Sequence, residues 1–241
     1  MIFIFIMIET KTMNTEEPKK NRPIALPTIR RLPFYLNALE RFRVSGQDTV
    51  STTELSIHMG VSDPVVKKDL NILGAPGKTG VGYAVAPLLR GIERFLGWDN
   101  PAPAVLVGVG GLGSALLGRS DIRRRVIDIV AAFDVNSDLI GKRVNGVNVY
   151  DADRLIETVR KLAPAVGVLT VPERVAQRMA NRLVAAGITK IWSFSAICLK
   201  LPKNVKVKRE VLTSGLAELL AGDTHSRTGA LQREALMEPE Y

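Results

Sequence analysis

The chain has 241 residues, of which 33 are Lys or Arg and 24 are Asp or Glu, giving a formal net charge of +9. With 46% hydrophobic and 5% aromatic residues, the composition excludes a disordered, collagen-like or coiled-coil chain. The chain has one cysteine, Cys198, which excludes an internal disulfide, and only two histidines, which disfavours a metal site. No segment has the roughly 20 apolar residues of a membrane span. We expect a cytoplasmic protein with an anionic partner, no bound metal, no membrane contact and Cys198 packed in its core.

Positive charge is concentrated towards the N-terminus. Between Lys19 and Phe95, 12 residues are basic and 6 are acidic, so this part of the chain is the expected contact for nucleic acid. The first 26 residues are expected to form a disordered tail. They begin with an apolar run that lacks the basic region and cleavage site of a signal peptide, and we favour Met13 over Met1 as the true start.

Three predicted helices follow this tail. Apolar residues at helical spacing predict the first helix, which begins near residue 28 and ends at Ser45-Gly46. The spacing of Ser51 and Glu54 matches a capping box, which starts a second helix that ends at Gly60. For a third helix, over residues 64–73, Asp63 is the expected N-cap and the following proline the first helical residue.

The third helix and the segment after it are basic. Residues 74–85 contain four glycines and Lys78 and end in a strand-like run. A glycine-rich basic hairpin after two closely spaced helices is typical of a winged helix-turn-helix, which binds DNA. An ordinary helical hairpin followed by a loop is the alternative interpretation.

The breaker-rich segment 97–103 marks a domain boundary. Beyond it, predicted strands alternate with predicted helices, which indicates a parallel sheet covered on both faces. We therefore expect an α/β protein in which an N-terminal winged helix-turn-helix domain (27–97) is followed by a Rossmann dinucleotide-binding domain (98–221) and a polar tail (222–241). Strands are predicted at 104–107, 126–133, 147–150, 166–171, 190–193 and 205–207, and helices at 88–96, 151–162, 172–186 and 212–221.

Residues 108–113, GVGGLG, have the spacing G-x-G-x-x-G. They follow a predicted strand and open a helix, and Asp134 comes 21 residues later, which is the full context of a dinucleotide-binding motif. Gly108 would permit the tight turn, Gly110 the approach of the pyrophosphate, and Gly113 close packing of helix and strand. The phosphates would lie at the helix N-terminus. A glycine-rich turn that binds no ligand is the alternative.

Asp134 also bears on the choice of dinucleotide. A carboxylate at the end of the second strand would accept hydrogen bonds from both adenosine ribose hydroxyls and repel a 2′-phosphate. Residues 123–125, three consecutive arginines, offer a competing interpretation as a 2′-phosphate clamp, but none of them follows that strand directly. NAD(H) is therefore favoured over NADP(H).

From about Pro27 to Leu220 the chain resembles the Rex family of redox-sensing transcriptional repressors. The resemblance rests on the segments PTIRRLPFYLNAL, GVSDPVVKKDL, GKTGVGY, VGVGGLG, AAFDVNSDLIG, LTVPERVAQ and IWSF, in this order. It implies a winged-helix domain joined to a Rossmann domain in a homodimer that binds palindromic operator DNA and leaves it when NADH binds. It also implies that the final helix crosses to the partner subunit, as a dimerisation helix.

The resemblance assigns two sets of site residues and no catalytic or metal-binding residue. The expected cofactor-binding residues are Gly108, Val109, Gly110, Gly111, Leu112, Gly113, Asp134, Thr170, Val171, Pro172 and Phe194, the last beside the nicotinamide. The expected DNA-binding residues are Ser62, Val65, Lys67, Lys68 and Lys78.

Several positions differ from the family's usual residues. Val65, Lys67 and Thr79 do so where bases would be read, which affects the expected operator sequence. Arg119 and Ser193 do so in the Rossmann part, which affects the expected response to NADH. A Rex-like repressor that responds to another ligand is therefore the alternative function. An enzyme is disfavoured, because hydride transfer needs a positioned acid or base and the Rossmann part has no histidine before its tail.

Overall fold

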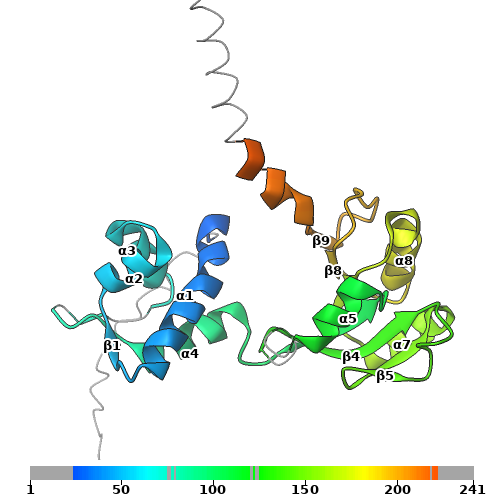
Figure 1. The fold of residues 1–241 in the computed structure, drawn as a ribbon, viewed down its shortest axis with the longest axis horizontal. Coiled ribbons are helices and arrows are strands. Elements are labelled where there is room, and N and C mark those ends of the chain that lie inside the picture. The colour runs from blue at the N-terminus through cyan, green and yellow to red at the C-terminus, as the bar shows by residue number, and fades with distance from the viewer. Residues whose placement is uncertain are drawn as a thin grey trace, which may run out of the picture. The chain divides into compact units, whose positions relative to one another are not determined.

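The computed structural model describes residues 24–74, 77–78, 80–119, 122, 125–217 and 219–221. The chain divides into two compact units, Met1–Ile92 and Glu93–Tyr241, which Figure 1 colours from blue to green and from green to orange. Most of the expected N-terminal tail, the polar tail from residue 222, Thr79, Arg123 and Arg124 lie outside the described residues.

The first unit is helical with a small two-stranded sheet. Its elements are α1 (Leu26–Val44), β1 (Thr49–Val50), α2 (Thr52–Met59), α3 (Asp63–Asn71), β2 (Tyr83–Ala84) and α4 (Val85–Leu96), which ends beyond the boundary between the units. The predicted apolar face of α1 is confirmed, since Leu32, Leu36 and Leu39 are almost fully buried. Together with the buried side chains of α2, α3 and α4, such as Leu55, Leu70 and Ile92, this face supplies the core of the unit.

The start of α2 follows the prediction and the start of α3 corrects it. Ser51 and Glu54 form the predicted capping box, and Gly60 ends α2 in the left-handed conformation. The N-cap of α3 is Ser62, and Asp63 is its first helical residue, so the assignment of Asp63 as N-cap was wrong. The Asp63 carboxylate instead accepts a hydrogen bond from the Thr53 hydroxyl at 2.8 Å, which ties α3 to α2.

The predicted hairpin after α3 is present in its described part. An antiparallel bridge joins Lys78 to Gly82, and β2 pairs with β1, a short strand that the sequence did not predict. Gly82 has φ +90°, and a Cβ there would collide with the carbonyl oxygen of Val50. Only glycine therefore lets the hairpin return so close to β1.

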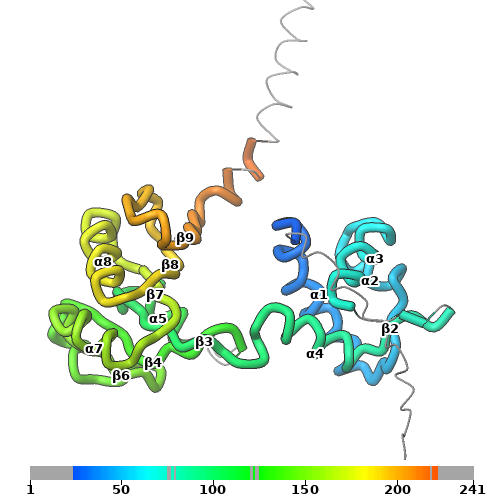
Figure 2. The backbone as a smooth tube through the Cα atoms, turned by 180° about the vertical axis from the view of Figure 1, so that it is seen from behind, coloured from blue at the N-terminus to red at the C-terminus, as the bar shows by residue number. Residues whose placement is uncertain are grey.

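The second unit is built on a seven-stranded sheet with the order β5-β6-β4-β3-β7-β8-β9 (Figure 2). All neighbours are parallel except β5 and β6, and β5 is a strand that the sequence did not predict. The strands are β3 (Ala102–Val107), β4 (Ile127–Asp134), β5 (Arg143–Val144), β6 (Val147–Asp151), β7 (Val166–Leu169), β8 (Lys190–Ser193) and β9 (Lys206–Arg209). The predicted α/β fold class, with a winged helix-turn-helix before a Rossmann-type sheet, is confirmed.

Helices cover both faces of this sheet. One buried cluster joins the strands to α7 (Leu155–Leu162), which follows the short turn η1 (Ala152–Arg154), and to α8 (Glu173–Ala185). The cluster on the opposite face joins them to α5 (Gly111–Gly118). Because β3 pairs in parallel with both β4 and β7, the carboxyl ends of these three strands meet at one edge of the sheet. This edge is where a doubly wound sheet binds its ligand.

Two details differ from the sequence prediction in this unit. The strand expected over 166–171 ends at Leu169, so Thr170 and Val171 leave the sheet at the ligand edge. Cys198 is exposed, so its expected place in the core was wrong. Within the described residues, no helix is both long enough and apolar enough to cross a membrane.

Candidate functional site

The glycine loop between β3 and α5 is constrained by close backbone packing. Gly108 has φ +99°, and a Cβ there would lie 2.8 Å from Val171 Cγ1. The Thr170 hydroxyl donates to the Gly108 carbonyl oxygen at 2.6 Å, and a Cβ on Gly113 would collide with that same oxygen. The roles predicted for Gly108 and Gly113 thus have a direct steric basis.

Asp134, at the end of β4, braces this loop from the other side. Its Oδ2 accepts a hydrogen bond from the Val109 N–H at 2.6 Å, and its Oδ1 accepts from Val135 and Asn136 N–H at 2.8 Å each. A carboxylate has about four acceptor positions. Asp134, which the sequence analysis assigned to the adenosine ribose, thus uses three of these positions to fix the shape of the loop.

The loop opens onto a cleft of about 590 Å³. Seven of the predicted cofactor-binding residues line it, namely Gly108, Gly110, Gly111, Asp134, Thr170, Val171 and Pro172. Open space surrounds the position of a Cβ on Gly110 or Gly111. No side chain caps the start of α5, so the first N–H groups of this helix face the cleft without an intrahelical acceptor. This is the arrangement that binds phosphate groups.

The other predicted cofactor residues do not line this cleft. Val109 acts through its N–H on Asp134, and Gly113 acts through packing. Leu112 is partly buried in the cluster beneath α5. Phe194 packs in that cluster too, with its ring centroid 4.7 Å from that of Trp192.

Two serines flank Phe194 at the end of β8, next to β7. Both Ser193 and Ser195 are buried, and the Ser193 hydroxyl accepts a weak hydrogen bond from the Ser195 N–H at 3.3 Å. The Ser195 hydroxyl is buried without a hydrogen-bond partner among the described residues. An unpaired buried hydroxyl is costly, which makes this strand end a candidate contact for a polar ligand group.

Sequence reasoning missed two cleft residues. Arg174 and Arg178 of α8 line the same cleft as the glycine loop, together with the apolar side chains of Val175 and Met179. Their segment, ERVAQRM, has the pattern of an ordinary exposed helix face, so nothing in the sequence distinguished them. Arg125, one of the three arginines that offered the competing interpretation as a 2′-phosphate clamp, donates to the Glu93 carboxylate at 2.8 Å.

In the first unit, α3 and the hairpin form a groove of about 540 Å³. Lys67 and Lys78, from these two elements, both line it. Lys68 and Ser62 are exposed on α3 outside the groove, while Val65 is half-buried. Within the described part of the chain no carboxylate pairs with any of the three lysines. Their charge is therefore available to an anionic partner such as a phosphate backbone.

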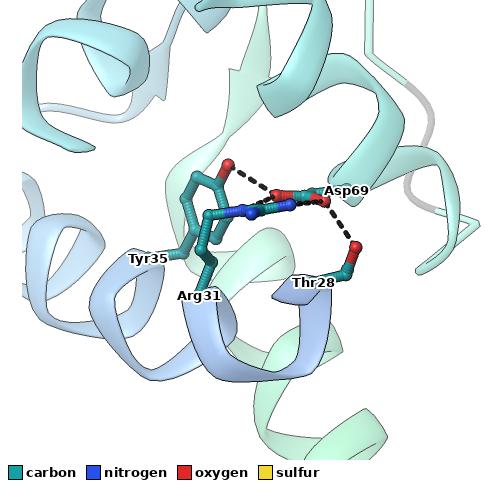
Figure 3. Close-up of polar contacts among 4 residues, drawn as sticks. All are labelled: Thr28, Arg31, Tyr35 and Asp69. Atoms are coloured by element: carbon teal, nitrogen blue, oxygen red, sulfur yellow. Dashed lines mark hydrogen bonds and ion pairs between the residues drawn. The ribbon is translucent and has the colours of Figure 1, made fainter. Parts of the chain in front are cut away.

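A buried carboxylate on α3 fixes this helix against α1 (Figure 3). Asp69 is fully buried and accepts hydrogen bonds from Thr28 Oγ1 at 2.8 Å and Tyr35 Oη at 3.1 Å. Arg31 donates to both of its oxygens, through Nε at 2.6 Å and Nη2 at 2.8 Å. Sequence reasoning did not identify this network, which sets the orientation of the helix that carries Lys67 and Lys68.

Charge and burial act against each other in this network. Burial raises the pKa of Asp69, but the hydrogen bonds from Arg31 and Thr28 outweigh that effect, so the pKa of Asp69 lies below its ordinary value. Burial, and then the negative charge of Asp69, raise the pKa of Tyr35 far above its ordinary value. Tyr35 is therefore protonated at neutral pH and donates its hydrogen bond to Asp69.

Fold and site together define a class of protein, in which a basic winged-helix unit is joined to a Rossmann unit with a cleft for a nucleotide. A family model described as "Putative DNA-binding protein N-terminus" matches residues 23–71, and one described as a CoA binding domain matches residues 99–197. The redox-sensing transcriptional repressor Rex of Porphyromonas gingivalis is 38% identical over 207 residues, which cover 86% of this chain and 95% of that protein. The chain belongs to the Rex family.

Crystal structures of RSP, a Rex-family repressor, have a similar fold. The complex of RSP with β-NAD⁺ and operator DNA matches with a TM-score of 0.78 and 30% identity, over 90% of this chain and 99% of that one. The complex of RSP with β-NADH matches with a TM-score of 0.75 and 29% identity, over 86% and 99% of the two chains.

Proposed function

We propose that this protein represses transcription by binding operator DNA and that NADH releases it from the DNA. The observation that carries the proposal is the presence, on one chain, of a groove lined by Lys67 and Lys78 and a cleft built on a glycine loop. Membership of a family of redox-sensing repressors supports it, as do the RSP complexes with operator DNA, NAD⁺ and NADH.

The cleft residues fit a dinucleotide. The open Cβ positions of Gly110 and Gly111 leave room for a pyrophosphate against the first N–H groups of α5. Asp134, beside this loop, accepts three backbone N–H groups and keeps about one acceptor position for the adenosine ribose, while its charge would repel a 2′-phosphate and so favour NAD(H) over NADP(H). The nicotinamide would lie towards the ends of β7 and β8, where the unpaired Ser195 hydroxyl offers a polar contact. The cofactor's oxidation state is the signal that the protein reads there.

On DNA, α3 would enter the major groove and the hairpin would follow the backbone. Lys67, Lys68 and Lys78 would contact phosphates, and Ser62 and Val65, at the start of α3, would face base edges. Phosphate contacts would make the affinity fall steeply with salt concentration.

The Rossmann unit is proposed to sense NADH without catalysis. Its sequence up to Ala221 contains no histidine, and its single tyrosine, Tyr150, stacks on Phe133 with ring centroids 5.9 Å apart. Within the described residues no group of three or more potential metal ligands is found. Among the described residues that line the cleft there is no histidine, tyrosine or lysine, the side chains that commonly move a proton during hydride transfer, which supports a sensor over an enzyme. The cytoplasm, where NADH and DNA are both available, is the proposed location.

We further propose a homodimer held together by the end of the chain. Residues 212–217 and 219–221 are helical, and Leu212, Leu216, Leu219 and Leu220 are each more than half exposed. An apolar stripe of this size is unfavourable in water and fits a partner subunit. A dimer presents two winged helices to a two-fold symmetric operator.

A mobility-shift assay with four ligand conditions tests the function. The DNA is an operator selected from random duplex by the ligand-free protein, and the additions are NADH, NAD⁺, ATP or none. Of these additions, we expect only NADH to release the DNA. Because NADH and NAD⁺ differ only at the nicotinamide, this result would locate the signal there. Release by ATP and not by NADH would favour a repressor of the same fold that responds to another ligand, and failure to select any sequence would contradict operator binding.

A further inference from the structure

The cleft contains a charge arrangement that the dinucleotide-binding motif does not account for. Arg174 and Arg178 lie four residues apart on α8, so their side chains emerge from the same face of the helix. Both line the cleft, and both are exposed at its rim. In the described residues neither guanidinium has a hydrogen bond or an ion pair with the protein.

The next arginine on this face behaves differently. Arg182, four residues beyond Arg178, pairs with the Asp153 carboxylate at 3.4 Å and donates to the Asp153 carbonyl oxygen at 3.0 Å, and it does not line the cleft. Two like charges on adjacent helical turns repel each other. The pair at the cleft is therefore unfavourable in the ligand-free protein, and an anion bound between the two arginines would relieve their repulsion.

The charge balance of the cleft indicates which anion. Asp134 carries the only negative side chain among the residues that line it, while a dinucleotide brings two further negative charges on its pyrophosphate. Partial positive charge at the start of α5 offsets part of this repulsion. With Arg174 and Arg178, the described cleft becomes net positive and so complementary to the ligand.

We propose that Arg174 and Arg178 bind the pyrophosphate from α8, opposite the N–H groups of the glycine loop. The planar guanidinium presents paired N–H donors that match phosphate oxygens. The proposal rests on the proposed dinucleotide site and adds to it a second, side-chain half of the phosphate contact. Because NAD⁺ and NADH carry the same pyrophosphate, the two arginines set the affinity for both forms and leave the ratio between them unchanged.

Calorimetric titration of the full-length protein tests this proposal. Wild type, the double variant Arg174→Gln/Arg178→Gln and the matched control Arg182→Gln are each titrated with NADH, NAD⁺, ADP-ribose and adenosine. We expect the double variant to lose about 10- to 100-fold in affinity for the three phosphate-bearing ligands, by a common factor, and none for adenosine. Its NADH affinity should also depend less on salt concentration. Arg182→Gln should bind as wild type does, and Arg174→Lys/Arg178→Lys should recover part of the loss.

Two results would overturn the proposal while leaving the dinucleotide site intact. One is unchanged NADH affinity in the double variant. The other is an equal loss for adenosine, which would place the arginines on the adenosine half. A wild-type protein that binds none of the phosphate-bearing ligands would instead refute the proposed function, and this proposal with it.

Discussion

Arg31 and Asp69 form a two-point ion pair between α1 and α3, with the Arg31 Nε 2.6 Å from Asp69 Oδ2 and its Nη2 2.8 Å from Asp69 Oδ1. The carboxylate is fully buried, whereas the arginine remains partly exposed at 27% of its side-chain surface. Thr28 and Tyr35 complete the set of donors, so every described hydrogen bond to the Asp69 carboxylate comes from a single helix, α1. The polar contact between α1 and α3 thus converges on one carboxylate.

Removing the arginine should destabilise the first unit strongly. Arg31→Ala leaves a buried charge with only two neutral donors, and we expect a loss of about 3 kcal/mol, near the lower end for a broken buried pair. Hydrogen exchange of the α1 and α3 amides measures this unit separately from the second one. Adding Asp69→Asn to Arg31→Ala should cost little more, because the buried charge is then gone. Fully additive losses would show that the two side chains do not act as a pair.

The same carboxylate should make the first unit sensitive to acid. Hydrogen bonds hold the pKa of Asp69 below its ordinary value in the folded protein, so its contribution is present above the unfolded pKa and is lost as the pH falls through the folded pKa. We expect the difference in unfolding free energy between wild type and Asp69→Asn to shrink from about pH 5 downwards. Urea unfolding at a series of pH values measures it, and a difference independent of pH would contradict this role.

A single methyl group should disable the glycine loop. Gly113→Ala places a Cβ against the Gly108 carbonyl oxygen, which Thr170 holds in place, so α5 must move away from the loop. We expect at least a tenfold loss of NADH affinity, about 1.4 kcal/mol. Gly118→Ala, at the other end of α5, meets only the Asn145 side chain at 3.3 Å and serves as the control. NADH affinity equal to wild type in Gly113→Ala would mean that the loop does not hold the cofactor.

Much of this architecture follows from local sequence signals. The spacing of Leu32, Leu36 and Leu39 predicts α1 because a helix repeats every 3.6 residues. The capping box at Ser51 and the glycine loop are equally local, since each depends on residues within one or two turns. The cleft residues at the ends of β3, β4 and β7 could also be predicted from the sequence, because the carboxyl ends of parallel strands lie at one edge of the sheet.

Features that depend on contacts far apart in sequence were missed. Asp69 lies 38 residues from Arg31, and no periodicity links a helix-borne carboxylate to an arginine on another helix. Arg174 and Arg178 become cleft residues only because β7 brings α8 beside the glycine loop. Ser62 and Asp63 are both favourable N-cap residues, so the choice between them depended on packing against α2. Cys198 has apolar neighbours in sequence but lies in an exposed loop after β8.

Deleting the final helix should abolish the proposed dimer. A chain that ends at Val211 lacks the exposed Leu212, Leu216, Leu219 and Leu220, and we expect monomer or aggregate with little operator affinity. A chain that ends at Ala221 keeps these leucines and is the control. Sedimentation velocity measures the oligomeric state, and a dimeric protein ending at Val211 that still releases operator on adding NADH would show that the helix is dispensable.

The mutual effect of NADH and operator DNA tests the proposed repressor function most directly. Two ligands coupled through one protein must weaken each other's binding by the same factor. NADH affinity is therefore measured by calorimetry with the free protein and with the protein saturated by operator, and operator affinity is measured with and without saturating NADH. Both affinities should fall by one common factor, and NAD⁺ should produce a smaller factor. Equal NADH affinity for the free and the operator-bound protein would contradict the proposed function.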